Sequence, residues 1–135
     1  MTRHTTRPAD RLHGDAGMTT LQVAIIFPAV LLWLLLIVQY GLWWHAKQVA
    51  DAAAAEAVAA ARIPAGTDVA GHDAAVAYLT EAGHLSNITV TVDVGTSTVT
   101  ATVTGDAPQL VPGFDWGVTA SSHATLEQFV PAADR

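Results

Sequence analysis

The chain has 135 residues, of which 51% are hydrophobic, and its formal net charge is −6 at pH 7. This length allows one membrane anchor and one small domain, and the lack of cysteine excludes disulfides, thiolate catalysis and the usual zinc-finger patterns. The acidic balance argues against nucleic acid as a partner, because no basic stripe is available to neutralise phosphates.

Residues 1–17 are rich in Arg, His, Thr, Gly and Asp and show no apolar periodicity. Such a composition cannot bury enough apolar surface to offset the entropy of ordering the chain. We therefore expect a disordered leader over this segment.

A long apolar run follows at residues 21–44, and no Asp, Glu, Lys or Arg interrupts it. As a helix it would extend roughly 36 Å, enough to cross a hydrocarbon core of about 30 Å with some tilt. A cleaved secretory signal is the alternative, but its apolar core is usually only about 7–15 residues long. The run therefore predicts a single transmembrane helix and a lipid environment.

The basic residues around this run predict its orientation. Arg3, Arg7 and Arg11 lie close before it, whereas the whole sequence after it holds only Lys47, Arg62 and Arg135. Because Lys and Arg favour the cytoplasmic side, we expect the N-terminus in the cytoplasm of a bacterium and the C-terminal domain outside its cytoplasmic membrane.

Two features inside and beside the run have expected roles. Pro28 lacks a backbone N–H and should kink the helix, which membrane helices tolerate better than soluble ones. Trp43, Trp44 and Lys47 have the composition of an interfacial belt and are predicted membrane-interface anchors.

The sequence after the run is dominated by alanine, the strongest helix former, and contains no Gly or Pro until Pro64. One continuous helix is therefore predicted over residues 18–62. The alanine-rich part could be a simple spacer or a packing spine that receives a sheet. We favour the spine, because an alanine helix alone in water is only marginally stable. Its expected packing positions are Val49, Ala53, Glu56, Ala57 and Ala60.

A small extracytoplasmic α+β domain is predicted over residues 64–130, with a tail at 131–135. It starts with a turn at 63–66 and a helix over about 68–82. Thr67 or Asp68 would cap this helix, and Gly83 would follow its end.

From Ile88 onward, apolar and polar residues alternate with a period of two. This pattern predicts three half-buried strands, over about 88–94, 98–104 and 118–126. We expect them to form an antiparallel meander whose apolar face covers the alanine-rich helix.

The segment between the second and third strands, residues 105–117, carries three large apolar side chains: Leu110, Phe114 and Trp116. They could form a contact site for a partner, or a lid that closes the edge of the sheet. The sequence leaves both alternatives open.

Several residues at the start of the apolar run point to a known family. Gly17 precedes Met18, Gln22 is the fifth residue after Gly17, Pro28 follows six positions later, and Tyr40 precedes a glycine near the far end. In these features the chain resembles the TadE-like pseudopilins of the bacterial tight-adherence (Flp) pilus machinery, which are type IV pilin-like.

This resemblance implies a structural role in assembling a pilus or related secretion apparatus. Prepilin peptidase would cleave after Gly17 and leave Met18 at the new N-terminus. The partners would be other pseudopilins and the membrane proteins of the pilus platform. The family has an acidic residue where this chain has Gln22, and that carboxylate is thought to pair with the new α-amino group. Gln22 accepts a hydrogen bond but cannot neutralise the amine, which favours a minor subunit.

Nothing in the sequence has the pattern of a catalytic, cofactor or metal site. The six histidines are scattered without the spacing of metal ligands, and no Gly-rich phosphate loop is present. We expect no enzymatic activity, no cofactor and no small-molecule substrate. The alternative function is a single-pass, membrane-anchored surface-binding module unrelated to pili.

Overall fold

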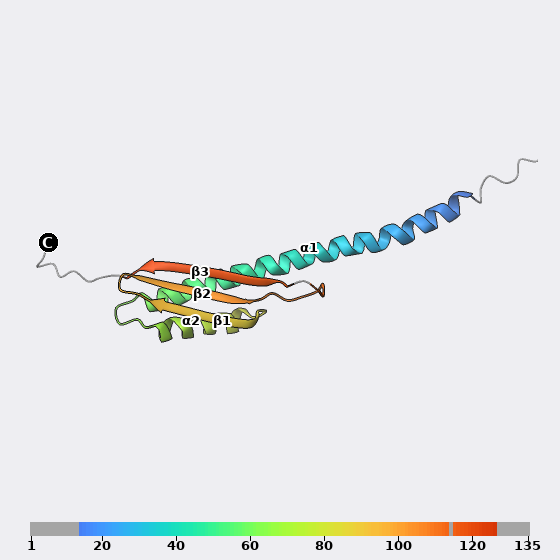
Figure 1. Cartoon of the computed structure of the whole chain (residues 1–135). Coiled ribbons are helices and arrows are strands. Elements are labelled where there is room, and N and C mark those ends of the chain that lie inside the picture. Colours follow the sequence, from blue (N-terminus) through green and yellow to red (C-terminus); the bar gives the residue numbers. More distant parts are fainter. Residues whose placement is uncertain (1–13, 114, 127–135) are drawn as a thin grey trace, which may run out of the picture. The chain divides into compact units, whose positions relative to one another are not determined.

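The computed structural model describes residues 14–113 and 115–126. Along the chain these form helix α1 (Gly14–Ala61), helix α2 (Asp68–Ala82) and strands β1 (Ser86–Val94), β2 (Thr98–Asp106) and β3 (Gly117–Thr125), as Figure 1 shows. The predicted α+β class is confirmed. The chain divides into two compact units between Leu36 and Ile37.

Helix α1 begins at Gly14, so the last residues of the predicted leader are helical; residues 1–13 lie outside the described part of the chain. Residues 9–27 contain no proline, so nothing in the sequence forces a start at Met18. The helix continues through Pro28. The kink expected there remains a prediction.

The alanine-rich part of α1 is the packing spine that the sequence favoured. Eight of its side chains are at most 6% exposed: Ala46, Val49, Ala50, Ala53, Ala54, Ala57, Val58 and Ala61. The position expected at Glu56 is wrong, since this side chain is exposed, and Ala60 is only half-buried. The buried residues instead form two neighbouring rows that each advance by four positions, from Ala46 to Val58 and from Val49 to Ala61, which keeps one face of the helix toward the core.

Helix α2 has both predicted ends. The Thr67 Oγ1 atom accepts a hydrogen bond from the Ala70 N–H at 3.1 Å, and Gly83 follows the last turn with φ 64°. The inner face of α2 presents Gly71, Ala75 and Leu79. Gly71 permits close approach to α1, because a Cβ there would lie 2.8 Å from the carbonyl oxygen of Ala57.

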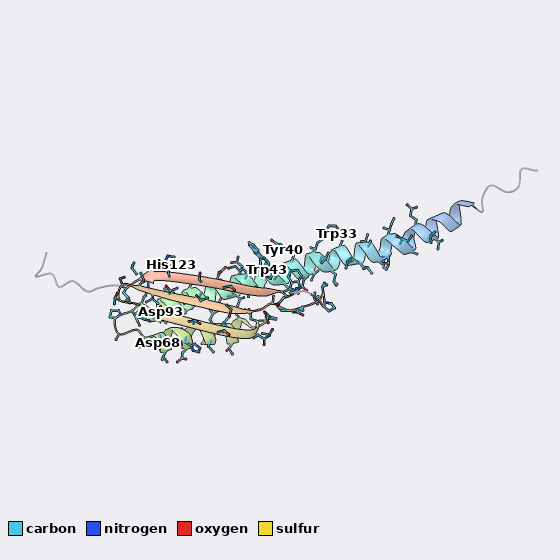
Figure 2. All side chains as sticks on the ribbon, viewed as in Figure 1. Trp33, Tyr40, Trp43, Asp68, Asp93 and His123 are labelled. Carbon is cyan, nitrogen blue, oxygen red and sulfur yellow. The ribbon has the colours of Figure 1, made fainter. Side chains whose placement is uncertain are left out.

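The three strands form one antiparallel sheet in the order β1–β2–β3. Its inner face contributes Val99, Ala101, Val103, Val118 and Ala120 to the same core as α2 and the spine. The outer face is polar, and Asp93, Thr100 and His123 lie side by side in register across it. Figure 2 labels Asp93 and His123 on this sheet. The predicted meander is thus confirmed, although β1 starts at Ser86 and β2 continues to Asp106.

Candidate functional site

Within the described residues, the largest run of exposed apolar side chains lies on α1 between residues 21 and 38. Every side chain in this stretch is exposed, with 65% exposure at Leu21 and 68% at Trp33, which Figure 2 labels. A soluble surface rarely presents such a continuous apolar patch. From Thr20 onward, α1 is also the single helix among the described residues that is long and apolar enough to cross a membrane.

This pattern changes abruptly at Gln39, whose side chain is fully buried. Its Nε2 donates a hydrogen bond to the Pro108 carbonyl oxygen at 3.0 Å. Its Oε1 accepts hydrogen bonds from the Leu110 N–H at 2.7 Å and the Val111 N–H at 3.3 Å. A buried amide has to find such partners, so Gln39 fixes the loop between β2 and β3 against α1.

The residues predicted to anchor the protein at the membrane interface have different surroundings. Trp43 is half-buried, and its Nε1 donates a hydrogen bond to the Gly117 carbonyl oxygen at 3.3 Å, so it joins α1 to the start of β3. Trp44 is 52% exposed. Lys47 forms a salt bridge with Asp51 at 2.8 Å along the same helix. Their role as membrane anchors stays a prediction.

The β2–β3 loop, residues 107–116, is closed at its base by a hydrogen bond from the Ala107 N–H to the Trp116 carbonyl oxygen at 3.1 Å. Leu110 is 48% exposed, whereas Trp116 is half-buried and packs against the core. Phe114, the third predicted contact residue, lies outside the described residues. Of the two described residues of the predicted set, Leu110 is therefore the one that exposes more of its apolar side chain.

The predicted processing residues Gly17 and Met18 lie within α1. Gln22 is exposed on the same helix. The structure does not test their role, so cleavage after Gly17 stays a prediction.

Among residues 14–113 and 115–126, no group of three or more His, Asp or Glu side chains could hold a metal ion. His45 and His84 meet edge to face, with ring centroids 6.5 Å apart. They border a cavity of about 140 Å³ that Leu42, Ala46 and Pro108 complete. The cavity presents apolar walls and two imidazoles, without an acidic partner in its lining.

Part of α1 is similar in sequence to a known protein family. Residues 17–59 match the family model of TadE-like proteins. The resemblance derived from Gly17, Gln22 and Pro28 is thereby confirmed over this segment, which is about a third of the chain. The TadE-like segment includes Gln39 and most of the buried spine. No curated protein and no solved structure matches the chain.

Proposed function

We propose that this chain is a minor TadE-like pseudopilin, a structural subunit without enzymatic activity that helps to assemble a Tad pilus or a related secretion apparatus. The observation that carries the proposal is the TadE-like match over residues 17–59, which coincides with the exposed apolar helix and the spine behind it. An exposed apolar helix is suited to anchoring, and the buried alanine spine is suited to packing a small sheet.

In this proposal the exposed apolar part of α1 crosses the bacterial cytoplasmic membrane. Residues 21–38 extend about 27 Å as a helix, close to the roughly 30 Å of a hydrocarbon core. The basic residues before α1 favour an N-terminus in the cytoplasm and a sheet outside the membrane. The sequence alone assigned residues 39–44 to the span as well. In the structure, two of these residues, Gln39 and Trp43, form hydrogen bonds with the sheet domain.

The partners proposed on this basis are membrane lipid, other pseudopilins, the platform membrane proteins of the pilus and prepilin peptidase. Nucleic acid, cofactors and small-molecule substrates have no part in it. Gln22 favours a minor subunit over a major one, because an uncharged amide cannot neutralise the α-amino group that leader cleavage would create.

An anchored surface-binding module is the second candidate, and the exposed outer face of the sheet favours it. Thr91, Thr100 and Thr119 are exposed there, next to Asp93 and His123. Hydroxyl-rich strands can hydrogen-bond a polar ligand. This candidate requires the sheet face for function and gives no role to Gly17.

The two candidates differ in the fate of the leader. In cells with an active prepilin peptidase, we expect intact-mass spectrometry of the membrane-extracted chain to find a mature protein that begins at Met18. A Gly17→Leu variant is the control and should keep residues 1–17. If the unaltered chain also keeps these residues, the pseudopilin assignment loses its processing step and the surface-binding module is favoured.

A further inference from the structure

We propose that the β2–β3 loop is a second membrane contact, in which Leu110 enters the lipid interface beside the point where α1 leaves the hydrocarbon. The inference rests on the proposed membrane placement of α1. It assigns the loop to lipid, where the sequence left open a protein partner or a lid on the sheet.

The depth of the loop follows from its hydrogen bonds to Gln39. This residue comes directly after the last residue of the exposed apolar stretch, Val38. Its side-chain amide holds Pro108 O at 3.0 Å and Leu110 N at 2.7 Å, both through direct contacts. The loop backbone therefore lies within one side-chain length of Gln39, the helix position directly after the exposed apolar stretch.

The surface at this level has the chemistry of a membrane interface. Residues 107–113 contain no charged side chain, and Leu110 and Pro112 are exposed. The exposed charge of the loop, Asp115, lies next to its base at Trp116. On α1, the exposed rings of Tyr40 and Trp44 lie 6.4 Å apart between centroids. Amphipathic aromatic rings favour the headgroup region, so helix and loop present compatible surfaces at one depth.

Lipid explains this arrangement better than a second copy of the chain. The loop is tied to the helix of its own protomer by a fully buried side chain. Every inserted copy therefore brings Leu110 to the interface, whether or not it has assembled. A contact with another protomer would instead require assembly before this exposed leucine could be covered.

The chain contains no cysteine, so single-cysteine variants can be spin-labelled without removing a native thiol. We would label Leu110→Cys, Pro112→Cys, Val30→Cys and Thr96→Cys in the full chain. Each variant would be placed in vesicles of phosphatidylethanolamine and phosphatidylglycerol. Electron paramagnetic resonance then compares collisions of each label with oxygen, which partitions into lipid, and with a water-soluble nickel chelate.

We expect the ratio of oxygen to nickel accessibility to be several-fold higher at positions 110 and 112 than at 96, in the β1–β2 turn, and highest at position 30. A lipid-like label at 30 with water-like labels at 110 and 112 would overturn the loop contact and leave the proposed function intact. A water-like label at 30 would overturn the membrane anchor itself. Labels at 110 and 112 shielded from both probes would overturn the inference in favour of a protein contact.

Discussion

Replacing Gly71 with alanine is expected to lower the free energy of unfolding of the sheet domain by about 2 kcal/mol. A Cβ at this position would lie 2.8 Å from the Ala57 carbonyl oxygen and 3.1 Å from Val92 Cγ1, so α2 has to move away from the spine. Overpacking of this kind costs about 1–3 kcal/mol, and contact with a backbone atom belongs at the high end. The higher helix propensity of alanine offsets only about 1 kcal/mol of this loss in the free energy of unfolding.

The effect is measurable as a fall in the melting temperature of the full chain in detergent, followed by near-ultraviolet circular dichroism. For a domain of this size, 2 kcal/mol corresponds to roughly 10 °C. Gly41→Ala is the matched control, because a Cβ on this glycine of α1 meets nothing within 4 Å. The close contact at Gly71 is contradicted if its alanine variant melts as high as the Gly41 variant.

The second large effect is expected at Gln39. Gln39→Leu removes the hydrogen-bond partners of Pro108 O and of two backbone N–H groups, at Leu110 and Val111. Leaving a buried polar group without a partner costs about 1–3 kcal/mol. We expect the loop to detach from α1 locally, with a smaller loss of stability in the sheet than Gly71→Ala causes.

Hydrogen–deuterium exchange of the full chain in micelles measures this detachment at the peptide that covers residues 107–113. In Gln39→Leu, the amides of Leu110 and Val111 should exchange at least tenfold faster than in the unaltered chain, which corresponds to about 1.4 kcal/mol of lost protection. Gln48→Leu, which changes an exposed glutamine on the same helix, should leave the exchange unchanged. Equal exchange rates in the two variants would show that Gln39 does not hold the loop.

Local chemistry made much of the domain predictable. Helix α2 was predicted with its observed bounds, because Thr67 supplies the capping oxygen and Gly83 adopts the positive φ that ends the helix. The strands followed from alternation of apolar and polar residues. Gly71 could not be interpreted from sequence, since glycine in a helix normally weakens it and the reason for this one is a contact with α1.

The limits of the apolar helix were harder to predict, because hydropathy does not distinguish a side chain that faces lipid from one that faces protein. Residues 21–44 read as one span, yet Gln39 is buried by a loop that lies 69 or more positions away in sequence. The detectable signal was the amide of Gln39, the second of two glutamines in the apolar run. Its partner depends on tertiary contacts that spacing alone does not reveal.

The processing residues and the membrane orientation rest on resemblance and charge, and no contact in the structure bears on them. Gln22 is the residue at which the chain departs from the TadE-like pattern. Its side chain is exposed on α1, so any partner of its amide would come from another subunit or from lipid. The alanine spine, in contrast, could be tested directly by packing. The spine was confirmed, whereas the prediction of Glu56 as a packing position was wrong, because this side chain lies on the exposed face of the helix.

The role in pilus assembly is tested most directly by deleting the coding sequence in its bacterium and counting surface pili by electron microscopy. We expect the deletion to reduce piliation strongly, and the full chain supplied in trans to restore it. A Gly71→Ala chain should restore it less well than Gly41→Ala at equal transcript level. Unchanged piliation in the deletion strain, with the Tad machinery expressed, would contradict the proposed function.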